Sequence, residues 1–247
     1  MYIRFYKMDI NGTSNISEFV LLKIEEGSLI GVLILYLATT FLSILGNVLV
    51  VIVFCKGKRS KTDLRPFLIN LAISDLLLAV FCMPFSFADA IFRTWMFTKP
   101  FCTFVLFIQM LSVAVSVFTN MAIGIDRLLV VLFPLRHRFF IIKYKYVIVS
   151  IWTSPSVLAS VQFIVSRVKH YAPGVLVCGE VWPNTESRRI YTVFILLLTY
   201  LIPLLILVVT YSFVGCKLWK RISPGNRDHY RDFLQWRSKI KVNLVLL

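Results

Sequence analysis

Residues 101–132 read FCTFVLFIQMLSVAVSVFTNMAIGIDRLLVVL, and this stretch decides the fold. It is nearly all apolar until Asp126-Arg127, and about 20 apolar residues are enough for a helix to cross the hydrocarbon core of a bilayer. The whole chain is 58% hydrophobic, with a mean hydropathy of +0.80. Four further stretches qualify, at residues 29–55, 64–92, 146–165 and 190–219. The sequence therefore predicts an all-α, polytopic membrane bundle with five transmembrane helices.

The segments between the spans complete the predicted organisation. Residues 1–28 form an N-terminal tail, and residues 220–237 form a polar loop after the fifth span. Between the fourth and fifth spans, residues 166–189 contain Tyr171-Ala172-Pro173-Gly174, and Pro followed by Gly favours a type II turn and a small hairpin. Residues 238–247 are interpreted as the start of a sixth helix.

The distribution of basic residues predicts the orientation. The net charge is +15, and most Lys and Arg residues fall in or beside residues 56–65, 136–145 and 217–241, which alternate onto one side of the membrane. The positive-inside rule makes that side cytoplasmic, so the N-terminal tail is extracellular. Glycosylation sequons at Asn11 and Asn15 support the same orientation. We expect a multi-pass plasma-membrane protein. Its basic residues are expected to contact membrane lipids and not to bind nucleic acid.

The five cysteines divide by compartment. Only Cys102 and Cys178 lie in segments expected outside, so these two are predicted to form a disulfide. Cys82 lies within a span. Cys55 and Cys216 lie near the inner surface, where either burial or palmitoylation explains them, and burial is favoured.

Two groups of charged residues lie inside or at the ends of spans. Asp75 is ten residues past Arg65, near the bilayer midplane, at a depth similar to that of Ser116 and Asn47. A carboxylate there is either protonated and hydrogen-bonded to another helix, or it forms a cation or proton site. Asp126-Arg127 ends the third span either as an interfacial anchor or as a charge lock that holds one conformation.

Short motifs recur in a fixed order along the chain. They are Gly46-Asn47-Val48, Leu71-Ala72-Ile73-Ser74-Asp75, Trp95-Met96-Phe97, Cys102, Asp126-Arg127-Leu128, Trp152 with Pro155, and Pro203 with Tyr211. Each motif is weak alone, but in this order and spacing they resemble rhodopsin-like (class A) G-protein-coupled receptors across nearly the whole chain. The resemblance implies a seven-helix fold, a heterotrimeric G protein as partner and no enzymatic activity.

The resemblance also implies a role for several residues by position. Asp75 and Ser116, with Asn47, would belong to a sodium pocket, and no other cofactor or metal is expected. Arg127 would be the inner lock, although Leu128 stands where the family usually has Tyr. The implied coupling and activation residues are Asp126, Arg127, Leu135, Pro203 and Tyr211.

The class of ligand follows from Gln109, seven residues after Cys102. Amine receptors of the family carry Asp at this position, and a neutral amide cannot pair with an ammonium group; the alternative reading is a hydrogen bond between helices. With Met83-Pro84-Phe85 and the CGEVWP stretch at 178–183, Gln109 resembles neuropeptide receptors of the neuropeptide Y, neuropeptide FF and tachykinin kind. The implied ligand-binding residues are Gln109, Met110, Val113, Gln162, Glu180, Trp182 and Asp89.

The sign of the nearby charges suggests the chemistry of the peptide. Glu180, Glu186 and Asp89 are all expected at the outer mouth, which would suit a cationic peptide. Charge reversal at Glu180 is then expected to weaken such a peptide.

Other readings of the chain are a transporter, an enzyme and a receptor fragment. A transporter would show an inverted repeat, and an enzyme would show a motif such as GxSxG or HExxH; neither pattern occurs in the sequence. The family's sixth and seventh helices supply part of the ligand pocket and the moving element of activation. An alternative expectation is therefore a truncated receptor that does not signal and acts at most as a partner of the full-length one.

Overall fold

The computed structural model describes residues 26–57, 64–92, 94–133, 144–172 and 175–220. In these ranges, 5 helical segments are long and apolar enough to cross a membrane. The predicted all-α membrane bundle is confirmed for the described chain. The chain divides into two compact units, residues 1–38 and 39–247, and the boundary lies within the first helix, α1 (Glu26–Lys56). The two units are described separately.

The N-terminal unit contributes only the first turns of α1 to the described structure. Its apolar side chains from Val32 to Leu37 are largely exposed, with Leu35 at 65%. This exposure is what a helix surrounded by acyl chains shows, because lipid requires no polar covering of the side chains.

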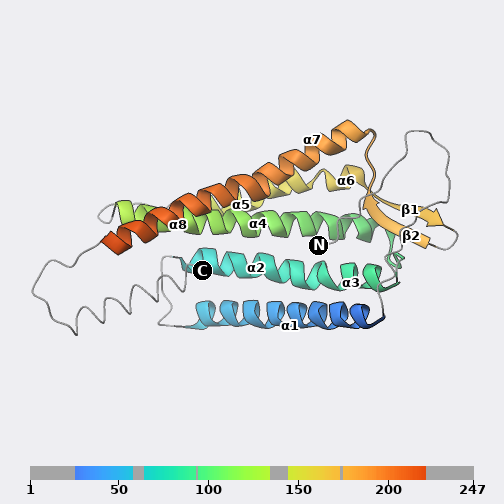
Figure 1. Cartoon of the computed structure of the whole chain (residues 1–247), viewed down its shortest axis with the longest axis horizontal. Helices are drawn as coiled ribbons and strands as arrows, with labels where there is room; N and C mark the ends of the chain where they lie inside the picture. The colour runs from blue at the N-terminus through green and yellow to red at the C-terminus, as the bar shows by residue number, and fades with distance from the viewer. Residues whose placement is uncertain (1–25, 58–63, 93, 134–143, 173–174, 221–247) are drawn as a thin grey trace, which may run out of the picture. The chain divides into compact units, whose positions relative to one another are not determined.

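From Thr39 onward the helices pack around α4 (Lys99–Leu132), with α2 (Arg65–Phe81), α5 (Tyr144–Ala159) and α8 (Ile202–Lys220) each running alongside it (Figure 1). The core lies between α2, α4 and α5. Its fully or nearly buried members are Phe67, Leu111, Val115, Ile151 and Ala159.

Three of the predicted spans are interrupted or extended. The second breaks at Cys82 between α2 and α3 (Met83–Phe92), because Pro84 has no N–H and disfavours helical backbone in the residue before it. The fourth breaks after Ala159, and a short α6 (Gln162–Val165) follows. In the fifth, a π-helical turn at Leu197–Leu201 directly precedes the segment with Pro203, where the ladder loses a donor.

The fifth span also begins earlier than residue 190, as α7 (Thr185–Leu196). Asn184 caps it, because the Asn184 side-chain oxygen accepts from the backbone N–H of Ser187 at 2.7 Å. Glu186 in the first turn favours the same start through the helix dipole. Five residues assigned to the outer loop are therefore helical.

The outer loop contains a hairpin of β1 (Ser166–Ala172) and β2 (Val175–Glu180), which pair antiparallel. The register places Val168 opposite Cys178 and is irregular between His170 and Ala172. The hairpin packs against the first part of α4 (Figure 1), and we name this end of the bundle the disulfide end and the opposite one the Arg127 end.

Candidate functional site

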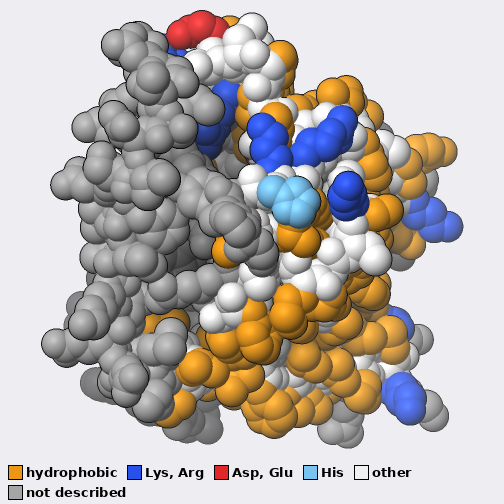
Figure 2. All heavy atoms as spheres, turned by 90° about the vertical axis from the view of Figure 1, so that its right-hand side faces the viewer, with side chains coloured by type: hydrophobic (Ala, Val, Ile, Leu, Met, Phe, Trp, Pro, Cys, Tyr) orange, Lys and Arg blue, Asp and Glu red, His pale blue; other side chains and the backbone are white. Residues whose placement is uncertain are grey.

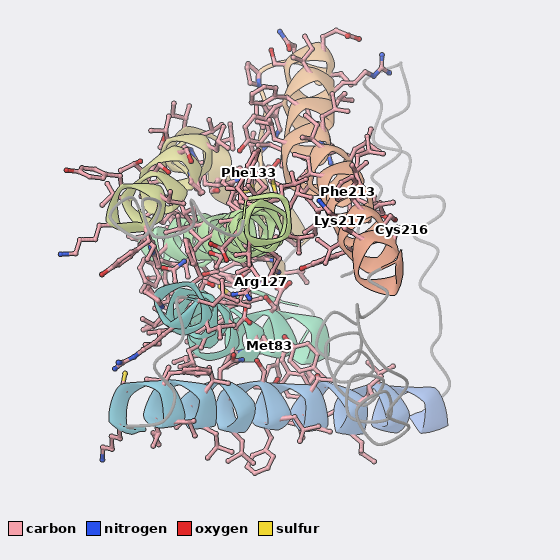
Figure 3. The ribbon with its side chains drawn as sticks, turned by 90° about the vertical axis from the view of Figure 1, so that its left-hand side faces the viewer. Met83, Arg127, Phe133, Phe213, Cys216 and Lys217 are labelled. Atoms are coloured by element: carbon pink, nitrogen blue, oxygen red, sulfur yellow. A yellow bond between two sulfur atoms is a disulfide. The ribbon has the colours of Figure 1, made fainter. Side chains whose placement is uncertain are left out.

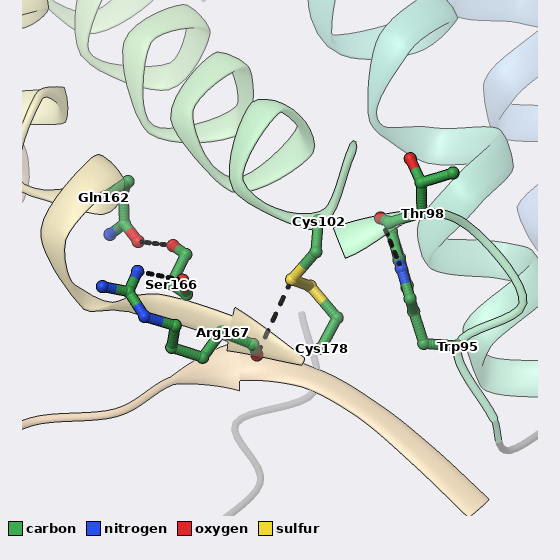
Figure 4. Close-up of a disulfide and its surroundings, with 7 residues drawn as sticks. All are labelled: Trp95, Thr98, Cys102, Gln162, Ser166, Arg167 and Cys178. Carbon is green, nitrogen blue, oxygen red and sulfur yellow. Dashed lines mark hydrogen bonds between the residues drawn. A yellow bond between two sulfur atoms is a disulfide. The ribbon is translucent and has the colours of Figure 1, made fainter. Parts of the chain in front are cut away.

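A disulfide fixes the hairpin at the start of α4. Cys102 and Cys178 are bonded, with their Cα atoms 5.7 Å apart, so the predicted pairing is confirmed (Figure 4). The hairpin is also attached to the loop before α4, because the Trp95 backbone N–H donates to the Leu176 carbonyl at 2.8 Å. These attachments give the outer loop one position over the bundle.

Aromatic rings fill the space beneath the hairpin. Trp95 is 3% exposed and lies 5.2 Å from the Phe97 ring, and Phe85 meets Phe101 edge to face at 4.5 Å. Edge-to-face pairs of this kind contribute about 0.5–1.5 kcal/mol beyond the area they bury. The floor under the hairpin is therefore rigid and apolar.

Three of the predicted ligand-binding residues are joined to one another by hydrogen bonds. Gln162 Nε2 donates to Glu180 Oε1 at 2.7 Å, and Trp182 Nε1 donates to Glu180 Oε2 at 2.8 Å. Ser166 Oγ donates to Gln162 Oε1 at 2.7 Å (Figure 4), and the Trp182 ring lies 5.0 Å from that of Tyr191. We call these five residues the Glu180 clamp, since they tie α6, the hairpin and α7 together.

Sequence reasoning missed Ser166 and Tyr191 as members of this group. Tyr191 also donates from its hydroxyl to the Leu158 carbonyl at 3.1 Å, which links α7 to α5. Ser166 is 1% exposed. Ser166 follows Gln162 by four residues, which is the spacing of neighbouring side chains on one face of a helix. This spacing could have predicted their contact.

The other predicted ligand-binding residues lie on α3 and α4. Gln109 is half-buried, and Val113 is 41% exposed four residues on, so the two share a face of α4. Met110 instead packs against the core. Asp89 is half-buried on α3.

Glu186, the third acid expected at the mouth, is engaged differently from Glu180. It lies 3.3 Å from Arg189 in the same helix, and both side chains are 70% exposed. A pair so exposed contributes little to stability.

The predicted cation site lies between α2 and α4. Ser116 Oγ donates to Asp75 Oδ1 at 2.7 Å, and Ser74 Oγ lies 2.8 Å from Ser116 Oγ. The structure thus brings Asp75 and Ser116 together, whereas Asn47 Nδ2 donates to the Ser43 carbonyl of its own helix at 2.9 Å. Carboxylate and hydroxyl oxygens are the kinds of ligand that bind hard cations. The oxygens of Asp75 and Ser116 are therefore suitable ligands for sodium.

A second polar group joins three helices through buried hydrogen bonds. Trp152 Nε1 donates to Asn70 Oδ1 at 2.6 Å, and Asn70 Nδ2 donates to Thr119 Oγ1 at 2.8 Å. Asn70 is 5% exposed and Thr119 is fully buried. The sequence analysis used Trp152 only as part of a family motif and did not predict this group. Asn70, a polar residue inside the second apolar span, was the feature of the sequence that could have indicated it.

At the Arg127 end, Arg127 lies on α4, with Phe213 and Lys217 on α8 (Figure 3). Its Nη2 is 3.5 Å from Asp126 Oδ2, and its side chain is 35% exposed. The buried Nε of Arg127 has no hydrogen-bond partner among the described residues. The guanidinium is therefore paired weakly, through a neighbour in sequence.

Gly124 allows α8 to approach α4 one turn from Arg127. A Cβ added at Gly124 would lie 3.0 Å from Leu207 Cδ2, 3.4 Å from Thr210 Oγ1 and 3.9 Å from Tyr211 Cζ. The Tyr211 ring therefore lies beside α4 near the Arg127 end. Pro203 is buried on α8, while Leu135, Asn11 and Asn15 lie outside the described residues.

The expected burial of two cysteines is wrong in this structure. Cys55 and Cys216 are both exposed, and only Cys82 among the free cysteines is buried. Each exposed cysteine lies close to the end of its helix, where fewer neighbouring helices cover a side chain.

Comparison with known proteins gives consistent matches. The family model for the 7 transmembrane receptor (rhodopsin family) matches residues 46–247. The neuromedin-K receptor of Homo sapiens is 32% identical over 207 residues, covering 83% of this chain and 44% of that receptor. The neuropeptide FF receptor 2 of Rattus norvegicus is 34% identical over 227 residues, covering 86% and 54%. The substance-K receptor of Homo sapiens is 31% identical over 217 residues, with the same coverage of 86% and 54%. The chain spans about half the length of the curated relatives it matches.

Proposed function

Since the chain belongs to the rhodopsin family of seven-transmembrane receptors, we propose that it acts as a receptor for an extracellular neuropeptide and passes the signal to a heterotrimeric G protein. The observation that carries the peptide class is Gln109, a half-buried neutral amide on α4, seven residues after Cys102. A small amine would require a carboxylate there to balance its charge. Relatives named for neuromedin K, neuropeptide FF and substance K support the same class.

The peptide would bind at the disulfide end. Gln109 and Val113 share one face of α4, and the Glu180 clamp holds Trp182 beside α7. These residues offer hydrogen-bonding and apolar groups around a hairpin that the disulfide already holds in place. A surface fixed before binding loses little entropy on binding, which favours affinity.

The G protein would bind at the Arg127 end. Arg127 is paired only weakly with Asp126, so a new partner can compete for its guanidinium. Tyr211 lies against the same helix beside Gly124, one turn from Arg127, and its hydroxyl would meet Arg127 in the active state. Leu135 would add an apolar contact with the G protein.

Sodium is proposed as an allosteric ion at Asp75. The carboxylate of Asp75 and the hydroxyl of Ser116 would hold it. Such an ion would supply a positive charge that keeps Asp75 ionised inside the bundle, where an uncompensated carboxylate is costly.

The proposed location is the plasma membrane, with the disulfide end and the N-terminus outside and the apolar helix surfaces in contact with lipid. Phe41 and Leu42 on α1 are 64% and 62% exposed, as expected for a lipid-facing surface. Asn11 and Asn15 would carry glycans.

The test is G-protein activation by peptides in cells that express the complete product of the transcript encoding these residues. We expect a peptide from an amidated neuropeptide library to activate it, and Gln109→Ala to weaken that peptide about fivefold through the loss of one hydrogen bond. Asn120→Ala is the matched control, because Asn120 is an exposed amide on the same helix. Activation by a biogenic amine and by no peptide would refute the proposal.

A further inference from the structure

The two faces of the β-hairpin carry different side chains. Val168 and its partner Cys178 lie on the face of the disulfide and the aromatic rings. Because side chains alternate along a strand, Arg167 and Lys169 lie on the opposite face. Both are exposed. Figure 2 faces the disulfide end and shows Lys and Arg side chains gathered near a histidine at this end of the molecule.

No acid of the paired strand stands opposite these two bases. The register pairs Arg167 with Gly179 and Lys169 with Val177. Arg167 Nη1 donates to the Ser166 carbonyl at 2.7 Å, which orients the guanidinium but leaves its charge uncompensated. Neither base forms an ion pair with a residue that the structure describes.

Two acids near this end, Glu180 and Glu186, have partners within the protein. Both carboxylate oxygens of Glu180 accept hydrogen bonds, one from Gln162 and one from Trp182. Glu186 is paired with Arg189. Glu180 keeps its negative charge, because both of its partners are neutral, but strand alternation places it on the face of Cys178. The charge of the face that carries Arg167 and Lys169 is therefore positive, which attracts anions and repels cations.

The spacing of the two bases also suits an extended ligand. Arg167 and Lys169 are two positions apart on one strand, a separation of about 6.6 Å. Alternate side chains of an extended peptide lie at the same separation. Two acidic residues at alternate positions could thus meet both bases at once.

We propose that the face of the hairpin formed by Arg167 and Lys169 is a docking surface for a carboxylate-bearing segment of the peptide ligand, so that this receptor selects acidic peptides. The inference rests on the proposed function and names the chemistry of its ligand. It replaces the cationic peptide that the signs of Glu180, Glu186 and Asp89 suggest in the sequence alone.

The test uses membranes that contain the complete transcript product and two short amidated peptide libraries. The libraries share every randomised position, and one carries fixed Asp residues at alternate positions where the other carries fixed Lys. We expect binding and G-protein activation from the Asp library, with affinity that falls as salt is added. Lys169→Glu should weaken the active Asp peptides about fivefold to tenfold and raise binding of their Lys counterparts.

The controls separate charge from folding. Lys145→Glu makes the same change at an exposed position at the start of α5 and should leave the ratio of Asp to Lys binding unchanged. A gain of Lys-peptide binding by Lys169→Glu cannot arise from misfolding, so it supports the proposal directly. Lys169→Gln should give an intermediate ratio.

Three outcomes would overturn the inference. If Lys peptides bind better than Asp peptides to the unchanged receptor, the inference fails while the peptide-receptor function stands. The same holds if peptides bind and Lys169→Glu does not change the ratio. If no peptide of either library binds or activates, the proposed function is refuted and the inference with it.

Discussion

Replacing Asn70 with leucine should loosen the packing of α2 against α4 and α5. The change removes two hydrogen bonds between helices, from Trp152 Nε1 at 2.6 Å and to Thr119 Oγ1 at 2.8 Å. Hydrogen bonds between membrane helices are worth about 0.6–1.7 kcal/mol each. Thr119 retains its bond to the Val115 carbonyl at 2.7 Å, so the main residual penalty is the unpaired Trp152 N–H. We expect a loss of about 2 kcal/mol.

The Cys82 thiol provides the assay. Cys82 is 2% exposed and its Sγ lies 3.6 Å from the Val105 carbonyl, so a maleimide reaches it only when α2 separates from α4. Cys55 and Cys216 are exposed and are replaced by serine beforehand. When reclosing is faster than labelling, the labelling rate follows the population of the open form. A loss of about 2 kcal/mol then predicts labelling about 30-fold faster.

Two further variants decide whether the hydrogen bonds are the cause. Asn47→Leu makes the same substitution where, among the described residues, the amide bonds to the Ser43 carbonyl of its own helix, and it should change the rate far less. Trp152→Phe should accelerate labelling in the unchanged background but slow it once Asn70 is leucine, because it then removes an N–H that has lost its acceptor. An unchanged rate in Asn70→Leu, or additive effects of the two changes, would refute this account.

Three other outcomes follow from the contacts. Gly124→Val should destabilise the bundle by about 1–3 kcal/mol, because an added Cβ would lie 3.0 Å from Leu207 Cδ2. Gly46→Val is the control in the same thiol assay, because a Cβ added at Gly46 would meet no described atom within 4 Å. Asp75→Asn should abolish the dependence of peptide affinity on sodium, measured in NaCl against KCl, and persistent dependence would contradict the proposed ion site. Cys178→Ser opens a loop with a sequence separation of 76 and should lower stability by about 4 kcal/mol on the chain-entropy estimate, seen as reduced surface expression and a lower thermal midpoint.

The membrane helices could be predicted from the sequence because lipid imposes a length and an apolar composition that few other structures share. The disulfide could be predicted because topology left only Cys102 and Cys178 outside. For the helices and the disulfide, one coordinate, the position along the membrane normal, was sufficient. The meeting of Asp75 with Ser116 was instead implied by the family resemblance, because similar depth grouped Asn47 with them and Asn47 bonds within its own helix.

Features that depend on rotation about a helix axis could not be predicted in this way. Depth alone does not show that Asn70 contacts both Thr119 and Trp152. This contact depends on how each of the three helices is rotated about its own axis. The exposure of Cys55 and Cys216 is of the same kind. The early start of α7 at Thr185 was instead local, and the capping pattern of Asn184 with acidic Glu186 was present in the sequence.

The hairpin shows how far a charge pattern can be interpreted without knowing which face carries it. Glu180 stands two residues after Cys178, so strand alternation already places both on the same face, the one bound to α4. The opposite face of β1 is less certain from sequence, because the register is irregular between His170 and Ala172, and a shift of one residue would exchange the two faces. Only the observed pairing of Val168 with Cys178 places Arg167 and Lys169 outward. The sign of a charge at a receptor mouth therefore predicts the ligand only once the face of the strand that carries this charge is known.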